Sequence, residues 1–337
     1  MYQFLESILP YFGSEDSLGC WFLFGISAVL GFYLLTKGGD WLSDHCSNLA
    51  SSLGVPSVVI GLTIVSIATS APELFTSIAA LRNNSTGMIL GNVIGSNIAN
   101  IGLILGISLL IKPIDTKDVI PRSQIFLLLA LTLFFSICLF IRGSSGIGWI
   151  IGSILLAYTL AYLFFITLGA MGSSTSPPSK KEEKDPCFAV SLSLLMILLA
   201  TVSLWVGSDA LVFGAKNFAL SAGIPEELIG FTLIAIGTSL PELAASLALL
   251  KKGESGMLLG NVLGSNMFNI GLVGGVAGIL GPIRSYTPHP WIDYLFMILL
   301  TAFFCFWLRG SKIQKKEGYI LLMTYLAATL ATWMLNG

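Results

Sequence analysis

Charged residues are scarce in this chain. Asp, Glu, Lys and Arg make up 10% of its 337 residues, and the net charge is only −1, whereas about 25% of the residues in soluble globular domains are charged. Apolar types reach 55%, with a mean hydropathy of +0.86. This composition excludes an ordinary soluble domain and offers no basic surface to a nucleic acid. We therefore expect a membrane protein surrounded by lipid, with no nucleic-acid partner.

Histidine and cysteine are also few. The two histidines, His45 and His289, have no second ligand at metal-binding spacing, and the five cysteines are odd in number and scattered. No apolar run contains an H-E-x-x-H motif, paired aspartates or a Ser/Lys pair of the kind that intramembrane enzymes need. These absences argue against an enzyme and against a resident cofactor.

Long apolar runs are what the chain has instead. Each run has about the 20 residues that one bilayer crossing takes. The ten predicted spans are about 18–36 with a polar extension to 51, 57–81, 86–111, 123–141 and 147–169 in the first half, and 188–220, 226–250, 255–280, 291–308 and 318–335 in the second.

The spans divide into two groups of five. The Ser-, Pro- and charge-rich segment 172–187 separates them; it is too polar to fold alone and is expected to be a short cytoplasmic linker. Five is odd, so a second copy of the pattern would enter the membrane from the opposite side. We predict an all-α polytopic protein of ten transmembrane helices, built from inverted halves at 1–171 and 188–337.

The basic residues predict the orientation. If ten spans alternate across the membrane, thirteen of the seventeen Lys and Arg residues fall on one side, which the positive-inside rule assigns to the cytoplasm. Both termini then lie outside, on the periplasmic face of an inner cell membrane. No basic segment precedes the first apolar run, so we expect that run itself, and not a cleaved signal peptide, to direct insertion.

Part of the first half is repeated in the second. Residues 60–103 recur without a gap at 229–272, 169 positions later, with 25 of 44 positions identical. The identities are concentrated in Thr-Ser-x-Pro-Glu-Leu and in Gly-Asn-Val-x-Gly-Ser-Asn-x-x-Asn-Ile-Gly, while the apolar residues between these motifs vary between the two copies. Duplication of the polar residues predicts a paired polar site.

An acidic residue lies near the middle of each copied span, Glu73 and Glu242. An acid there costs about 2.5–3.5 kcal/mol on the insertion scale and is usually functional. A lone Ser, Thr or Asn in a span more often bonds its own helix or a neighbour, but here hydroxyls recur at helical spacing around each acid. The two stripes are Thr69, Ser70, Glu73 and Ser77, and Thr238, Ser239, Glu242 and Ser246.

Prolines and a second span add oxygen atoms. Pro72 cannot donate to the carbonyl of Ala68, nor Pro241 to that of Gly237, and a cation is one partner for such carbonyls. The next span of each copy carries a hydroxyl and an amide four residues apart. It also has a G-x-x-x-G pattern that permits close helix approach. These residues are Ser96 and Asn100 with Gly91 and Gly95, and Ser265 and Asn269 with Gly260 and Gly264.

The motifs ATSAPEL with GNVIGSNIAN, and GTSLPEL with GNVLGSNMFN, resemble the two alpha repeats of sodium/calcium exchangers in the cation/calcium antiporter superfamily, especially its compact prokaryotic branch. The repeats lie at about 57–111 and 226–280, and the resemblance covers essentially the whole chain. It implies a calcium site of Glu73 and Glu242 with the backbone carbonyls of Thr69 and Thr238. It implies sodium sites that share the glutamates and use the hydroxyls of Ser70, Ser96, Ser239 and Ser265 and the backbone carbonyls of Ser66 and Ala235, with Asn100 and Asn269 as the central polar pair.

Two positions depart from the usual family pattern. Ala68 replaces a glycine, which we expect to stiffen the bend in its helix. Asn269 stands where several microbial relatives and the potassium-dependent branch have aspartate, so only two carboxylates remain and no potassium requirement is expected.

The predicted function is antiport of Ca²⁺ against Na⁺ by alternating access, with no cofactor. No protein partner is indicated, and we expect the chain to act as a monomer. A Ca²⁺/H⁺ exchanger is the nearest alternative, although its usual Gly-Asn-x-x-Glu pattern is missing from GNVIG and GNVLG. A cation channel, which would need no counterflow, is a further alternative.

Overall fold

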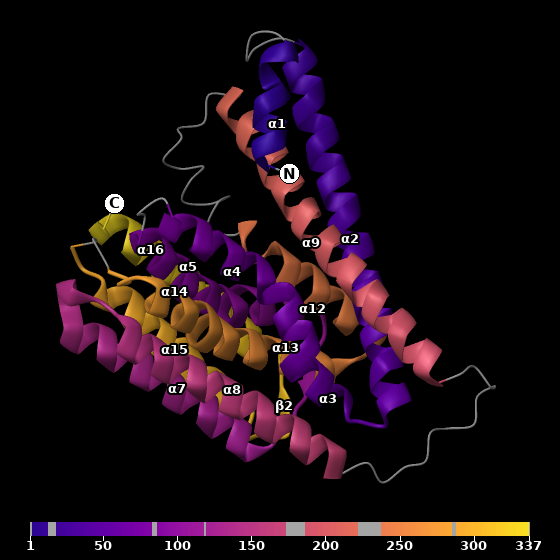
Figure 1. Ribbon diagram of the computed structural model, residues 1–337, viewed down its shortest axis with the longest axis vertical. Coiled ribbons are helices and arrows are strands. Elements are labelled where there is room, and N and C mark those ends of the chain that lie inside the picture. The colour runs from indigo at the N-terminus through magenta and orange to yellow at the C-terminus, as the bar shows by residue number, and fades with distance from the viewer. Residues whose placement is uncertain are drawn as a thin grey trace.

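The structure is a computed structural model that describes residues 2–12, 18–82, 86–117, 119–172, 186–221, 237–284 and 288–336. Nearly all of these residues are helical (Figure 1). Within them, eight helices are long and apolar enough to cross a membrane, and the apolar helix Trp291–Trp307 is shorter. The chain is thus an α-helical polytopic membrane protein, as predicted.

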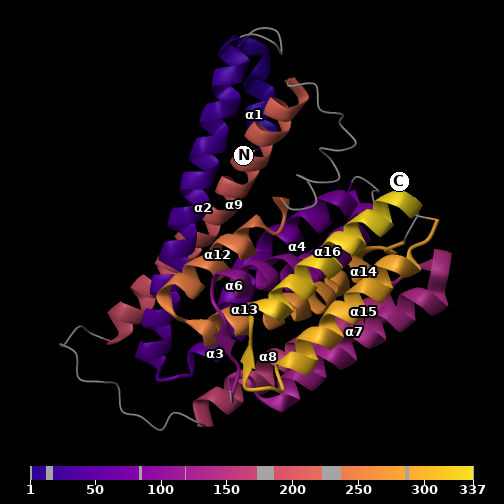
Figure 2. The same cartoon turned by 180° about the vertical axis from the view of Figure 1, so that it is seen from behind.

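Two very long helices, α2 (Leu18–Leu53) and α9 (Pro186–Ser221), pack along each other. They are antiparallel: Gly31 meets Gly207, and Phe24, earlier in α2, meets Gly214, later in α9. At about 1.5 Å per residue, 36 residues exceed a bilayer core of about 30 Å, so these helices tilt in the membrane or extend beyond its core. Figures 1 and 2 show the pair inclined to the other helices.

A short helix that the sequence did not predict precedes this pair. It is α1 (Tyr2–Ile8), followed by the 3₁₀ turn η1 (Leu9–Phe12). Leu5 of α1 joins a small apolar cluster with Phe24 of α2 and Phe213 of α9. The N-terminal segment therefore folds back onto the long helix pair.

The copied segments form the interior. Between 61% and 83% of the apolar windows of Ser57–Arg82, Thr86–Ile111 and Ser255–Leu280 are buried, against 22–39% in the other five long spans. Three of these helices contain a wider, π-helical turn. The elements are α3 (Ser57–Ile60), η2 (Gly61–Val65), α4 (Ser66–Arg82), α5 (Thr86–Ala99), η3 (Asn100–Leu105), α6 (Gly106–Ile111), α12 (Leu240–Lys252), α13 (Ser255–Phe268), η6 (Asn269–Val273) and α14 (Gly274–Leu280).

Four helices cover the interior on the side away from α2 and α9 (Figures 1 and 2). They are α7 (Arg122–Arg142), α8 (Trp149–Gly172), α15 (Trp291–Trp307) and α16 (Lys315–Asn336), with a 3₁₀ turn η4 (Gly143–Ser145) after α7. Glycines permit close packing across the halves: a Cβ on Gly102 would lie 2.7 Å from Tyr325 of α16, and Gly271 lies directly against Thr159 of α8.

Loops of the two halves also pair with each other. The strands β1 (Ile114–Asp115) and β2 (Lys312–Ile313) are antiparallel, with Ile114 opposite Ile313, and Ile147 forms a bridge with Ile283. Ile283 lies 169 positions after Ile114, so these two residues occupy equivalent loops in the two halves. Each of these equivalent loops pairs with a loop of the other half. The 21-residue helix α7 separates the two pairings, which therefore lie at opposite ends of the molecule. This small ladder was not predicted.

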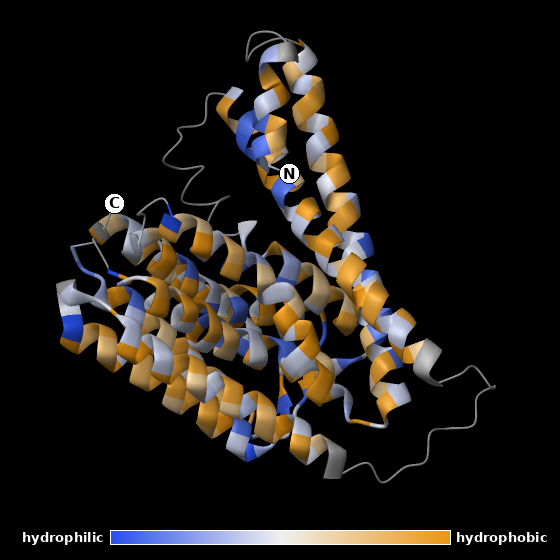
Figure 3. Ribbon diagram, in the orientation of Figure 1, coloured by the Kyte–Doolittle hydropathy of each residue, from blue (hydrophilic) through white to orange (hydrophobic). Residues whose placement is uncertain are grey.

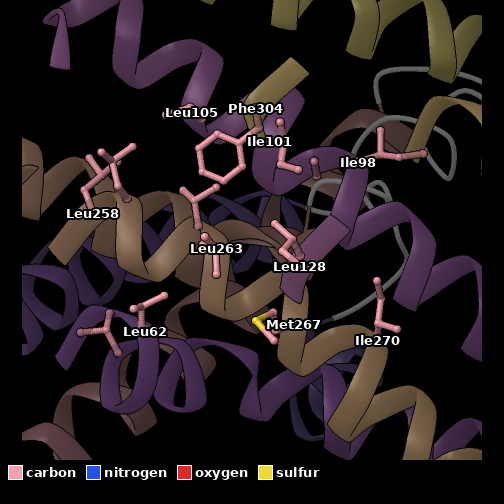
Figure 4. Packing of buried hydrophobic residues seen from close by; sticks show 14 of the residues in the cluster. Leu62, Ile98, Ile101, Leu105, Leu128, Leu258, Leu263, Met267, Ile270 and Phe304 are labelled. Carbon is pink, nitrogen blue, oxygen red and sulfur yellow. The ribbon is translucent and has the colours of Figure 1, made fainter. Parts of the chain in front are cut away.

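Apolar side chains line both the interior and the outside. Figure 4 shows Leu62, Leu263, Met267 and Ile101 packed within the central cluster. Many large apolar residues are exposed as well, among them Phe126 and Phe140 on α7, and Figure 3 shows such residues on the outer helices. Exposed apolar surface of this extent suits lipid contact.

Nine of the ten predicted spans coincide with helices in the described ranges. The seventh, 226–250, is described only from residue 237, and 173–185 of the expected linker lie outside the described residues. The ten-helix inverted topology and its orientation remain predictions.

Candidate functional site

Two buried glutamates meet in the interior. Glu73 lies on α4 and Glu242 in the first turn of α12; each is 1% exposed, and α4 contacts α12. Their carboxylates are close enough for a direct Coulombic repulsion. Two acids far apart in the sequence therefore share one polar centre.

The polar atoms around this centre lack hydrogen-bond partners. Within the described part of the chain, sixteen buried side-chain atoms make no hydrogen bond. Ten of these belong to three repeat-related pairs. They are all four carboxylate oxygens of Glu73 and Glu242, the hydroxyls of Ser70 and Ser239, and the amide atoms of Asn100 and Asn269. Leaving such a polar group buried without a partner lowers the stability of the folded protein by about 1–3 kcal/mol, unless a ligand binds the group.

Hydroxyls from α4 also approach the second acid. Thr69 and Ser70 lie near enough to the Glu242 carboxylate to stabilise its charge, but neither makes a hydrogen bond of good geometry with it. Carboxylate, hydroxyl and amide oxygens are the ligand types that hard cations such as Ca²⁺ prefer. The donor set fits such a cation, and the carboxylates, the Ser70 and Ser239 hydroxyls and the two amides have no hydrogen-bond partner among the described residues.

The central amides coincide with an irregularity in both copies. The π-helical segment η3 begins at Asn100, and η6 begins at Asn269. A π-turn inserts one extra residue into a helical turn and is often found at functional sites. Both asparagines were predicted from the sequence as site residues, whereas the π-turns were not.

The two prolines behave differently. Pro72 lies inside the continuous helix α4, whereas Pro241 follows a turn at residues 238–239 and is the second residue of α12. The carbonyl of Gly237 accepts a 2.6 Å hydrogen bond from the hydroxyl of Ser208 on α9. In the structure a hydroxyl on a neighbouring helix is a partner of this freed carbonyl, a partner that the sequence did not predict.

The close helix approach predicted from glycines is found in the second copy. A Cβ on Gly260 would lie 2.6 Å from the carbonyl oxygen of Val58, and one on Gly264 would lie 2.7 Å from that of Leu62. Gly91 and Gly95 have nothing within 4 Å among the described residues. The counterpart of the segment that meets Gly260 is 226–235, outside the described residues.

Three further predicted residues lie in different surroundings: one in a hydrogen-bond network, one beside a cavity and one outside the described residues. Ser66 bonds the carbonyls of Gly61 at 2.7 Å and Asn261 at 3.1 Å. Thr238 is half-buried and lines a cavity of about 340 Å³. Ala235 lies outside the described residues. The cavity is bounded by α1, α4 and α9, through Tyr2, Pro72, Thr76, Trp205, Ser208, Asp209, Val212, Gly237 and Thr238.

Two asparagines that the sequence analysis did not select organise the hydroxyls. Asn92 donates to Ser77 at 3.0 Å and accepts from Ser96 at 3.5 Å. Asn261, its counterpart, donates to Ser246 and accepts from Ser265, both at 3.3 Å. Their signal was present in the sequence: both lie in the copied motif, four residues before the serine they bind.

The chain matches a family model described as sodium/calcium exchanger protein over residues 23–168 and 192–334. It is 34% identical to an uncharacterized membrane protein of Methanocaldococcus jannaschii over 89% of this chain and 95% of that one. It is 32% identical to the sodium/calcium exchanger MaX1 of Methanosarcina acetivorans, with the same coverage. A solved structure of the sodium-calcium exchanger NCX_Mj superposes with a TM-score of 0.79 at 32% identity, covering 92% of this chain and 99% of that one. With most of its length matched by the family model and these relatives, the chain belongs to the sodium/calcium exchanger family.

Proposed function

We propose that this protein exchanges Ca²⁺ for Na⁺ across the membrane by alternating access at a central two-glutamate site. The meeting of Glu73 and Glu242, both buried and both surrounded by unpartnered oxygens, is the observation that carries the proposal. Family membership and relatives named sodium/calcium exchangers support the choice of ions.

Charge balance favours one Ca²⁺ between the two acids. Removing one partner of a buried charge pair is strongly destabilising, because the other charge stays buried and uncompensated. Two carboxylates close together, with no cation between them, likewise leave buried negative charge uncompensated. A divalent cation bound between them offsets that charge. In the proposed site, the backbone carbonyls of Thr69 and Thr238 complete the calcium ligands.

Sodium competes for the same carboxylates with neutral oxygens. Na⁺ sites would share Glu73 and Glu242, and the two ions would exclude each other. Their further ligands are the hydroxyls of Ser70, Ser96, Ser239 and Ser265 and the carbonyls of Ser66 and Ala235, with Asn100 and Asn269 at the centre.

The helix pair α2 and α9 is the moving part of this mechanism. It touches the interior through small residues: a Cβ on Gly39 of α2 would lie 2.8 Å from the carbonyl oxygen of Ala244 on α12. In the proposed mechanism the cavity beside Thr238 would serve as the entrance on the side of α1, while α2 is bonded to α12 elsewhere. Sliding of the pair would close one side and open the other.

The proposed topology has ten helices in two inverted halves, 1–171 and 188–337, joined by the linker 172–187. The reciprocal loop pairings at opposite ends support it. Both termini then lie outside an inner cell membrane, and a single chain holds the complete site.

The test is isotope calcium uptake into proteoliposomes with imposed Na⁺, K⁺ or H⁺ gradients. We expect uptake driven by the Na⁺ gradient only, and its loss in Glu73→Gln and in Glu242→Gln, because either change leaves one carboxylate to balance Ca²⁺. Glu6→Gln, on an exposed residue of α1, is the matched control and should transport normally.

Other outcomes would distinguish the alternatives. Uptake driven by a pH gradient alone would favour a Ca²⁺/H⁺ exchanger, and single-channel currents would favour a channel. Exchange retained in either glutamine variant would contradict the two-glutamate site.

A further inference from the structure

We infer that Asn92 and Asn261 are positioning residues that orient the serine hydroxyls of the site toward sodium. The inference rests on the proposed function and concerns residues that touch the hydroxyls, not the ions.

A hydroxyl ligand has one proton and two lone pairs. It can bind a cation only through a lone pair, with its proton directed away to an acceptor. The proton of Ser265 has such an acceptor: it is donated to the Oδ1 of Asn261 at 3.3 Å. The lone pairs of Ser265 then remain available to a cation.

The position of Ser265 makes this orientation relevant. It lies one turn before Asn269, whose amide is unpartnered, and its hydroxyl is 3.4 Å from that of Thr69 on α4. Thr69 in turn lies one turn before Glu73 and approaches Glu242. Ser265 therefore borders the polar centre from the α13 side.

Asn261 holds the hydroxyl of Thr69 as well. Its Oδ1 accepts from Thr69 at 3.3 Å, so one amide oxygen takes protons from both halves of the chain. Its Nδ2 is fixed by donation to Ser246 at 3.3 Å. Asn261 is 1% exposed, so its amide is enclosed by the protein.

The first half repeats the arrangement. Asn92 accepts from Ser96 at 3.5 Å, and its Nδ2 donates to Ser77 at 3.0 Å and to the backbone carbonyl of Glu73 at 3.2 Å. Ser77 and Ser246 thus fix the asparagines in place, a role different from the ion-ligand role that their position on the glutamate stripe predicted.

The inference predicts a difference between the two ions. In the proposed function calcium uses carboxylates and backbone carbonyls, to which the amide of Asn261 makes no hydrogen bond, while sodium uses the serine hydroxyls. A neutral hydrogen bond contributes about 0.5–1.5 kcal/mol. We expect Asn261→Ala to raise the KM for Na⁺ about three- to tenfold and the KM for Ca²⁺ less than about twofold.

The test measures both KM values in proteoliposomes of the full chain, for wild type, Asn261→Ala, Ser265→Ala and the double variant. If Asn261 acts through Ser265, the double variant should have the sodium KM of Ser265→Ala, because coupled residues are not additive. Asn266→Ala is the matched control: it is a buried asparagine on the same helix whose Nδ2 bonds only its own helix, at Val262. Asn266→Ala should not change the KM for Na⁺ more than it changes the KM for Ca²⁺.

Asn92→Ala carries the same prediction toward Ser96 and serves if Asn261→Ala does not fold. Equal changes in both KM values, or additive effects in the double variant, would overturn the inference while the exchange activity stands. A wild-type chain without sodium-driven calcium uptake would overturn the proposed function, and this inference with it.

Discussion

Lys252, at the end of α12, forms a 2.5 Å ion pair with Asp44 of α2, and its ammonium group also donates to the carbonyl of Asp40 at 2.9 Å. The contact joins the long helix pair to a helix that carries a site glutamate. It lies on the part of α2 that follows Gly39, whereas the cavity beside Thr238 is bounded by α1 and α9.

Breaking this ion pair should change the balance between access states. We expect Asp44→Asn to destabilise the conformation that is open beside α1. The apparent Ca²⁺ affinity measured from that side should then fall by about twofold or less, since a partly exposed ion pair contributes little. Uptake measured as a function of Ca²⁺ concentration in oriented vesicles gives this apparent affinity.

The effect of Asp44→Asn should disappear in concentrated choline chloride, because salt screens exposed charges. Asp115→Asn, on an exposed residue of β1, is the control. The same affinity change in both variants would contradict a specific role for the Lys252 contact.

Ser208→Ala should destabilise the protein by about 1–3 kcal/mol, because it leaves the Gly237 carbonyl buried without a donor. Thermal unfolding in detergent measures the change. Ser203→Ala removes a similar bond, to Leu34 at 2.9 Å, but that carbonyl keeps its own helix partner. A loss as large in Ser203→Ala would contradict this explanation.

Gly264→Ala should destabilise the protein by about 1–3 kcal/mol through overpacking. Its Cβ would meet the Leu62 carbonyl at 2.7 Å and the side chain of Ser66, which two hydrogen bonds hold in place. Gly25→Ala, on α2, has nothing within 4 Å and should be neutral or slightly stabilising. Thermal unfolding and calcium uptake check both, and an unaffected Gly264→Ala would show that α13 need not lie so close to η2.

Potassium should have no effect on sodium-driven calcium uptake. The polar centre has an amide at Asn269, so among the described residues it offers two carboxylates and no third anionic group for another cation. Uptake measured in choline and in potassium buffers should agree. A potassium requirement would show that Asn269 does not have the role we assign to it.

The site could be predicted from the sequence because intramembrane acids are conspicuous. Glu73 and Glu242 interrupt apolar runs, and the duplication marks Asn100 and Asn269 beside them. The hydrogen bonds were harder to predict, since they depend on how each helix is rotated: Ser208 from another helix satisfies the Gly237 carbonyl.

Most of the helices followed from the length of the apolar runs. The missed elements are short: α1 has seven residues, and the β1–β2 ladder has two residues in each strand. Such elements depend on contacts between distant segments, for example Leu5 with Phe213 or Ile114 with Ile313. No local pattern in the sequence records those contacts.

The reciprocal pairing of Ile114 with Ile313 and of Ile147 with Ile283 means that each half completes a backbone ladder for the other. Neither half alone would contain the partner that its own loop needs. The two halves are therefore joined by backbone hydrogen bonds at opposite ends of the molecule, in addition to the covalent link between them.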